Sequence, residues 1–349
     1  MADLALLEKL CSIPGVSGEE EAVREAILQE IRPYADSVTI TPLGNILAEK
    51  KGKAPAKTRL MLSAHMDEVG LIVTHITEKG LLKFDTVGGI LKMVLCGRSV
   101  TVLGKNGPVN GVMGCAPVHL MKGKDEDKPM PVEDLSIDIG ARSREEAARW
   151  VSPGDRAVFD SIWDASRGRI IGKALDDRAG CTILIDLLKS DLPCDMTFAF
   201  TVQEEVGLYG AQTATNAVKP QAAIVVESTT AADVPGVSEE NKVCRVGKGP
   251  VVSFMDRRTI YDKAYYRMAL HLAEEKGIPC QPKLGVAGGN DAGAIAPSGE
   301  GVRTIAVSLP CRYLHSAFSM ISSEDFHHAE ELVKALAERI ALSPPEIRI

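Results

Sequence analysis

The amino-acid sequence predicts an α/β fold: a mixed, largely parallel sheet flanked by helices, with a small, mainly β domain inserted into it. Three observations support this prediction. After Arg169, apolar strand-like runs alternate with helix-like segments. Between about Leu71 and Trp163, short β-like runs alternate with glycine turns instead. Acidic and imidazole side chains follow predicted strands on both sides of that stretch, so we expect its two flanks to form one domain.

The composition is that of an ordinary globular protein, and it argues against several classes of partner. The chain has 349 residues, of which 45% are hydrophobic and 25% charged. Its net charge of −7 argues against a nucleic-acid partner, which would require a basic surface. No uninterrupted apolar run approaches the ~20 residues of a membrane span. The amino terminus lacks the pattern of a signal peptide, and the eight scattered cysteines are typical of reduced thiols, so we expect a cytoplasmic protein.

The first part of the chain is expected to contain one helix and three strands. Ser17-Gly18-Glu19-Glu20 has the spacing of a capping box, which predicts an amphipathic helix from Glu19 to Pro33. Strand signals follow at 37–40, 45–50 and 59–63. The third run leads directly into His65-Met66-Asp67, so an imidazole and a carboxylate are expected just beyond its end.

The middle of the chain is predicted to be the inserted β domain. Its β-like runs are 71–76, 82–84, 99–103 and 111–115, and 143–150 is expected to form one short helix. The polar run 122–129 is predicted to be an exposed loop. We therefore divide the chain into a catalytic domain, residues 1–70 plus 164–349, and an inserted domain, residues 71–163.

The last part of the chain is predicted to supply most of the α/β sheet. The expected helices are 177–190, 209–218, 261–277 and 322–342. The expected strands are 196–203, 222–227, 279–284 and 303–309.

Two adjacent carboxylates, Glu204 and Glu205, follow the apolar run 196–200. A Glu-Glu pair is most often part of a solvated loop, but the run before this pair is too apolar for one. Neighbouring side chains on an extended backbone point to opposite sides. Two carboxylates at such a place repel each other unless a cation or a proton intervenes. This indicates that one can bind a metal while the other handles a proton.

Further imidazole and carboxylate groups are expected at the ends of other predicted strands. Since the carboxyl ends of strands in an open α/β sheet face one crevice, these groups are expected to converge. Each has an ordinary alternative, such as a structural histidine or an N-cap for Asp176-Asp177, but five coincidences on successive strands are improbable. Two imidazoles and several carboxylates suit zinc, cobalt or manganese better than calcium or magnesium. The groups are His65 and Asp67, Asp176 and Asp177, Glu204 and Glu205, Glu227, and His315.

Taken together, five segments of the chain resemble metallopeptidase family 42, the glutamyl aminopeptidase-like and tetrahedral aminopeptidases, some of which are labelled endoglucanases. With Ser17-Gly18 they extend in the family's order as far as His315, so the resemblance covers nearly the whole chain. The segments are His65-Met66-Asp67-Glu68-Val69-Gly70, Ala174-Leu175-Asp176-Asp177-Arg178-Ala179-Gly180, Gln203-Glu204-Glu205-Val206-Gly207, Gly288-Gly289-Asn290-Asp291-Ala292 and Arg312-Tyr313-Leu314-His315-Ser316.

The resemblance implies a role for each candidate residue and two divalent metal ions, zinc or cobalt first and manganese as an alternative. Glu204 would be general base and acid, and Asp67 would orient His65. The chain departs from the common pattern at Glu227, where many members have Asp, and at Asn290, where Thr is common. The implied ligands are His65, Asp176 and Glu227 for one ion, and Asp176, Glu205 and His315 for the other, with Asp176 bridging.

The implied activity is that of an aminopeptidase that removes residues from the amino termini of short peptides. The chemistry of the residues agrees, because a water between two cations loses its proton near neutral pH and Glu204 can take it. The resemblance also implies that the inserted domain mediates dimerisation and that dimers build a tetrahedral dodecamer. Lys92 and Arg257-Arg258 could shape a subunit interface or a pocket, but solvated charge is at least as good an interpretation.

Three alternative functions remain at this stage. A deacylase or carboxypeptidase would use the same di-metal site on other amides. An endoglucanase is disfavoured, because glycoside hydrolysis does not require two histidine ligands and 4% aromatic residues leave little for sugar stacking. An inactive shell-forming scaffold is disfavoured because the ligand set is intact.

Overall fold

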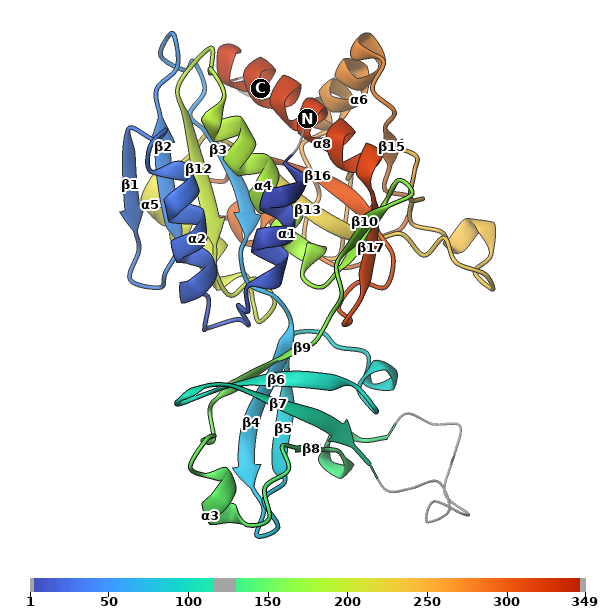
Figure 1. The fold of residues 1–349 in the computed structure, drawn as a ribbon. Helices are drawn as coiled ribbons and strands as arrows, with labels where there is room; N and C mark the ends of the chain where they lie inside the picture. Colours follow the sequence, from blue (N-terminus) through green and yellow to red (C-terminus); the bar gives the residue numbers. More distant parts are fainter. Residues whose placement is uncertain (1–2, 116–129, 346–349) are drawn as a thin grey trace.

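Figure 1 shows a larger body, in which helices cover a sheet, joined to a smaller barrel. The computed structural model describes residues 3–115 and 130–345. The exposed loop predicted at 122–129 lies outside the described residues. The predicted mixed α/β class is confirmed, because helices alternate with strands that pair in both directions.

The larger body is built on an eight-stranded sheet whose central pairs are parallel. In sheet order its strands are β1 (Ser37–Ile40), β2 (Ile46–Lys50), β12 (Met196–Thr201), β3 (Leu60–His65), β13 (Ala222–Thr230), β16 (Arg303–Cys311), β14 (Val251–Val252) and β15 (Gln281–Pro282). β12 and β13 run parallel to β3 on its two sides, and β16 runs parallel to β13. β1–β2, β2–β12 and β14–β16 are antiparallel pairs. The central strands are almost wholly buried, which explains their apolar sequences.

Helices pack on the sheet and leave its carboxyl edge free for the site. They are α1 (Leu4–Ser12), α2 (Glu21–Ile31), α4 (Leu175–Lys189), α5 (Tyr209–Val218), α6 (Lys263–Lys276), α7 (Ala292–Ile295) and α8 (Ser323–Leu342). In Figure 1, α1, α2 and α4 lie in front of the sheet and α5 lies behind it. Within residues 3–115 and 130–345, no helix combines the length and the apolar character needed to cross a membrane.

The first helix, α1, was missed in the sequence, although a signal for it is present. Asp3 caps it by accepting a hydrogen bond from the Leu6 main-chain N–H at 3.0 Å. Its apolar residues recur at helical spacing and form one buried face. These residues are Leu6, Leu7, Leu10 and Cys11.

The smaller body is a closed barrel of antiparallel strands. The chain enters it at β4 (Gly70–Ile76) and leaves it at β9 (Arg156–Phe159), and the barrel packs around a core of its own. The other strands and short helices are β5 (Leu82–Val87), η1 (Lys92–Val94), β6 (Ser99–Gly104), β7 (Gly107–Gly114), η3 (Val132–Asp134), β8 (Ser136–Asp138) and α3 (Arg144–Ala147). A separate three-stranded sheet contains two strands that follow the barrel in the chain and one strand from near its end. These strands are β10 (Asp164–Ser166), β11 (Arg169–Gly172) and β17 (Ser319–Ser322).

The capping box predicted at Ser17 and Glu20 is wrong. The helix α2 begins at Glu21, and Glu20 at its N-cap makes no capping hydrogen bond with its side chain. Instead, the Ser17 hydroxyl donates to Asp67 Oδ2 at 2.6 Å. Glu20 Oε1 accepts from the main-chain N–H groups of Gly18 and Gln203. The two side chains have the right spacing for a cap, but both are used in tertiary contacts.

Several predicted boundaries differ from the structure for local reasons. The strand predicted at 196–203 ends at Thr201, because the chain turns at Gln203, which has a φ of 54°. The helix predicted at 261–277 begins at Lys263, because Asp262 caps it. The strand predicted at 279–284 shortens to the two residues of β15, at the edge of the sheet.

Candidate metal centre

The candidate site residues converge at the carboxyl edge of the central strands. His65 is the last residue of β3, and Glu204 and Glu205 follow β12 in the neighbouring turn. His315 lies in the loop between β16 and β17. Parallel neighbours therefore bring residues that are far apart in sequence to one place.

Two of the expected positions need correction. Glu227 does not end its strand: β13 continues to Thr230, and Glu227 pairs with Ser308 inside the sheet. Asp176 does not end a strand either. It lies in the first turn of α4 with non-helical dihedral angles (φ −90°, ψ 106°), which carry its side chain toward the sheet edge.

One group of possible ligands is centred on His65. His65 Nε2 lies 3.3 Å from Asp176 Oδ1 and 3.4 Å from Glu227 Oε1. All three side chains are buried, and one donor atom from each lies within 4.8 Å of the others. This spacing is suited to a single cation between them.

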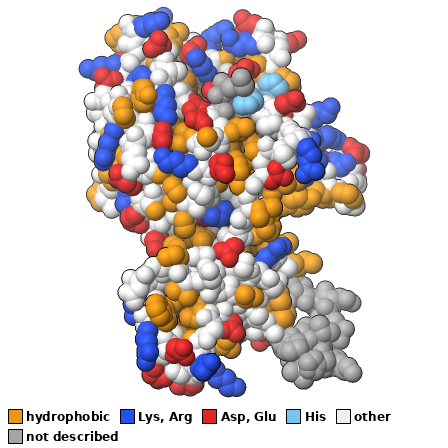
Figure 2. All heavy atoms as spheres, viewed as in Figure 1, with side chains coloured by type: hydrophobic (Ala, Val, Ile, Leu, Met, Phe, Trp, Pro, Cys, Tyr) orange, Lys and Arg blue, Asp and Glu red, His pale blue; other side chains and the backbone are white. Residues whose placement is uncertain are grey.

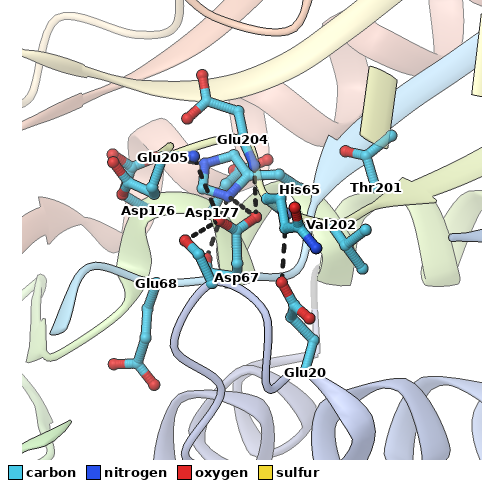
Figure 3. Close-up of polar contacts among 12 residues, drawn as sticks. Glu20, His65, Asp67, Glu68, Asp176, Asp177, Thr201, Val202, Glu204 and Glu205 are labelled. Carbon is cyan, nitrogen blue, oxygen red and sulfur yellow. Dashed lines mark hydrogen bonds and ion pairs between the residues drawn. The ribbon is translucent and has the colours of Figure 1, made fainter. Parts of the chain in front are cut away.

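A second group is centred on His315 and shares Asp176 with the first. His315 Nε2 lies 3.3 Å from Asp176 Oδ2 and 3.3 Å from Glu205 Oε2. The two oxygens of Asp176 thus face different histidines, each accompanied by one glutamate. In Figure 3, Asp176 and Glu205 lie side by side next to His65. This arrangement fits a carboxylate that bridges two cations.

The protonation and hydrogen bonding of the group also fit a cation. Glu205 Oε1 and Glu227 Oε2 are buried, with no hydrogen-bond partner among the described residues. Burial raises the pKa of Glu205 to about 7. Burial and the charge of Asp176 raise the pKa of Glu227 well above its usual range. Carboxyl groups crowded in this way remain ionised only beside positive charge, which divalent ions supply.

The two histidines supply part of that charge. Although burial acts against it, contacts with Asp176 and Glu205 raise the pKa of His315 to about 9. The pKa of Asp176 is lowered in spite of burial, because His315 and His65 contact its two oxygens. The residues that hold these charges are thus the same residues that could bind metal.

Glu204 is set apart from the other carboxylates. Figure 3 shows its side chain directed away from Asp67, and it lines an open cavity beside the metal ligands. Burial raises the pKa of Glu204 well above its usual range, with Glu205 and Asp291 adding to the effect. A carboxyl group that readily takes up a proton beside possible metal ligands is suited to carry a proton during a reaction.

Asp67 contacts both His65 and the turn that carries Glu204. His65 Nδ1 lies 3.1 Å from the Asp67 main-chain oxygen and 3.4 Å from Asp67 Oδ1. The Asp67 carboxylate also accepts from the N–H groups of Glu204, at 3.0 Å, and Glu205, at 3.2 Å. Sequence reasoning could assign Asp67 only to His65, because main-chain partners leave no signal in the sequence.

The barrel contacts the site at His315. His315 Nδ1 lies 2.9 Å from the main-chain oxygen of Gly89, in the segment between β5 and η1. Because the Gly89 oxygen can only accept, this contact places the proton on Nδ1 and leaves Nε2 free as a metal donor. The orientation of a possible ligand therefore depends on the smaller body.

A buried ion pair lies behind Asp67. Lys173 Nζ contacts Glu68 Oε1 at 2.7 Å, and Arg178 Nη2 lies 3.6 Å from the same oxygen. Arg178 Nη1 also donates to the Leu10 main-chain oxygen at 2.7 Å. These contacts tie α1 and the start of α4 to the chain segment that carries His65 and Asp67.

A cavity of about 620 Å³ opens from the possible metal ligands. Asp176, Glu204, Glu205, Glu227 and His315 line one side of it. Arg257, Arg258 and Lys283 also line it, and Lys283 is only 5% exposed. Lys283 was missed in the sequence, where it stands as a single lysine in a short, ambiguous strand.

Comparisons with known proteins identify one family for the chain. The family model described as M42 glutamyl aminopeptidase matches residues 44–332. A lysyl aminopeptidase of Pyrococcus furiosus is 32% identical, over 97% of this chain and 98% of that protein. A glutamyl aminopeptidase of Lactococcus lactis is 30% identical, over 95% of this chain and 94% of that protein.

Solved structures give the same result. The TET1 peptidase of Pyrococcus horikoshii, which can assemble into a tetrahedron or a large octahedral shell, is 38% identical with a TM-score of 0.85. The match covers 96% of this chain and 98% of that one. A related structure, PhTET1-12s, is a dodecamer in its asymmetric unit; it also has 38% identity and a TM-score of 0.85, with 97% and 99% of the two chains covered.

Proposed function

The chain belongs to the M42 glutamyl aminopeptidase family, and we propose that it removes single amino-terminal residues from short peptides at a site for two divalent metal ions. The observation that carries this proposal is the position of Asp176, each of whose oxygens faces a different histidine–glutamate pair. Zinc and cobalt suit this mixture of imidazole and carboxylate donors best, with manganese as the alternative.

In the proposed hydrolysis, different residues bind the metal ions, transfer the proton and position the other groups. His65, Asp176 and Glu227 would hold one ion, and Asp176, Glu205 and His315 would hold the other. Bound cations lower the pKa of water and polarise the carbonyl group of the scissile peptide bond. Glu204 accepts the proton of the attacking water and delivers it to the nitrogen of the departing peptide. Asp67 contacts both the His65 ring and the turn that carries Glu204, and so fixes their positions relative to each other.

The reaction is tested with an unblocked peptide and its N-acetylated twin. We expect the unblocked peptide to shorten stepwise from its amino end while the blocked twin persists. Chelation should abolish the activity, and zinc, cobalt or manganese should restore it. Mass spectrometry of the products gives the readout. Equal cleavage of both peptides would favour a deacylase or an endopeptidase, and cellulose hydrolysis without peptide cleavage would favour a glycosidase.

The proton-transfer role is tested by Glu204→Gln. The amide cannot take up the proton, so kcat should fall by roughly 10²–10⁴-fold while metal content stays at the wild-type value. Glu205→Gln is the matched control, because it removes a proposed ligand and should lower metal content as well. A Glu204→Gln variant that keeps most of its activity would contradict the role.

The cavity supports a preference for peptides with an acidic amino-terminal residue. Within residues 3–115 and 130–345, no carboxylate lies within 4.0 Å of the charged groups of Arg257, Arg258 or Lys283. Such cations in a cavity are suited to bind a substrate carboxylate.

The position of Arg258 is built into the fold. A Cβ atom at Gly289 would lie 2.5 Å from Arg258 Cγ, and one at Gly293 would lie 2.7 Å from Arg258 Cβ. Asp256 Oδ1 accepts from the main-chain N–H groups of Arg258 and Thr259, both at 2.7 Å. The two glycines and the Asp256 turn therefore hold the arginine stem at the rim of the cavity.

The side-chain preference is tested with Lys283→Gln on glutamyl, glutaminyl, leucyl and lysyl nitroanilides. Loss of one charged hydrogen bond should lower the glutamyl-to-glutaminyl ratio of kcat/KM by about 10-fold or more. Lys276→Gln, on the exposed side of α6, is the control and should change nothing. A wild-type enzyme that prefers the leucyl or lysyl substrate would remain an aminopeptidase but would refute the acidic preference.

We also propose that residues 71–163 form an inserted dimerisation domain within a catalytic domain of residues 1–70 and 164–349, and that dimers assemble further. Hydrophobic side chains gather over the barrel and its junction with the larger body on the face shown in Figure 2. Leu91, which lines the cavity, and Met93, two residues later, are 62% and 67% exposed. Surfaces of this kind are typical of protein interfaces.

Assembly is tested by light scattering of the full-length chain. We expect a particle several times heavier than the 37.3 kDa monomer, up to a dodecamer. Val112→Glu and Met93→Glu on the barrel should reduce the mass because a charge opposes burial at an interface. A monomeric mass for the wild-type chain would contradict the proposal.

A further inference from the structure

The turn after β12 is held by side chains rather than by the sheet. Gln203 has a φ of 54°, in the left-handed region that residues other than glycine rarely adopt. Four successive main-chain N–H groups, beginning at Val202, each donate to a side-chain oxygen. The acceptors are Asn45 Oδ1 for Val202 at 3.1 Å, Glu20 Oε1 for Gln203 at 3.2 Å, Asp67 Oδ1 for Glu204 at 3.0 Å and Asp67 Oδ2 for Glu205 at 3.2 Å.

Glu20 occupies an unusual place among these acceptors. It is only 2% exposed, and its Oε1 also accepts from the Gly18 N–H at 2.7 Å. Burial raises the pKa of Glu20 to about 7. Burying a carboxyl group costs free energy that its hydrogen bonds must offset. Glu20 does not offset this cost by capping α2, since its side chain makes no capping bond there.

The contact lies one residue before Glu204. Figure 3 shows Glu20 reaching the turn from the side opposite the Glu204 carboxyl group. Without this acceptor, the Gln203 N–H would lose its partner at the residue with the least favourable backbone conformation of the turn. The whole peptide unit could then rotate, and the Glu204 side chain would move with it.

We propose that Glu20 is a positioning residue, which holds the Gln203 N–H and thereby aims the Glu204 carboxyl group at the substrate. The inference rests on the proposed function, in which Glu204 carries the proton. Within the described part of the chain, the Glu20 side chain forms no hydrogen bond or ion pair with the side chain of a proposed metal ligand. Its effect depends on the reach of its oxygen, not on its charge.

Two conservative variants separate the effect of the position of the Glu20 oxygen from the effect of its charge. Glu20→Gln keeps an oxygen at the same distance but removes the charge. Glu20→Asp keeps the charge but withdraws the oxygen by one methylene. We expect Glu20→Gln to retain kcat within about threefold, and Glu20→Asp to lose about 10- to 100-fold in kcat, since small displacements of catalytic groups have effects of this size. KM and metal content should stay at wild-type values in both.

Amide hydrogen exchange gives a readout that does not need turnover. Exchange in the peptide that contains Gln203 should accelerate in Glu20→Asp and stay slow in Glu20→Gln. Glu25→Ala, on the exposed side of α2, is the control for the helix itself and should change neither exchange near Gln203 nor kcat.

The outcomes distinguish this inference from the proposed function. If kcat falls in Glu20→Gln as much as in Glu20→Asp, or more, the claim that the position of the oxygen matters and its charge does not is wrong. Wild-type activity and exchange in Glu20→Asp would overturn the positioning role altogether. An inactive wild-type enzyme, or an active Glu204→Gln variant, would instead defeat the proposed function, while the exchange experiment would still test the hydrogen bond.

Discussion

The structure depends on a concentration of buried negative charge at the carboxyl edge of the sheet. Asp176, Glu204, Glu205 and Glu227 share this place with the two imidazoles of His65 and His315. Carboxylates so close together and so little hydrated repel one another, and protons or cations must compensate. The raised pKa values of Glu205 and Glu227, and the buried oxygens of these residues that lack a hydrogen-bond partner, both indicate that positive charge is needed here. Much of the surrounding architecture holds these groups together against their repulsion.

The chain resists that repulsion with hydrogen bonds to its own backbone. Asp67 binds two N–H groups of the turn that carries Glu204 and Glu205, and Glu20 binds the one before them. Behind Asp67, the contacts of Glu68 with Lys173 and Arg178 anchor the neighbouring segments. The predicted capping box does not form for the same reason: the side chains of Ser17 and Glu20 hydrogen-bond to Asp67 and to the Gln203 N–H instead of capping α2.

The two bodies of the molecule are linked at the site itself. The Gly89 oxygen, from the barrel segment after β5, meets the ring of His315. Leu91, close by in sequence, lines the same cavity as the basic side chains. A movement of the barrel would therefore reach both a proposed metal ligand and the wall of the substrate cavity. The assembly that we propose for the barrel would thus be physically coupled to the chemistry that we propose for the larger body.

The sequence by itself indicated the mixed α/β class, through its local hydrophobic period, and the family, through the resemblance of five short motifs that also contain most of the candidate residues. It placed His65, Glu204 and Glu205 near the ends of the right strands, because strand periodicity is a short-range property. Only the tertiary structure decided which oxygen faces which histidine, that β13 continues past Glu227, and that Lys283 enters the cavity. It alone showed Glu20 and Gln203 in contact, although 183 residues separate them. Such contacts depend on how distant segments pack, and neither composition nor spacing along one chain records them.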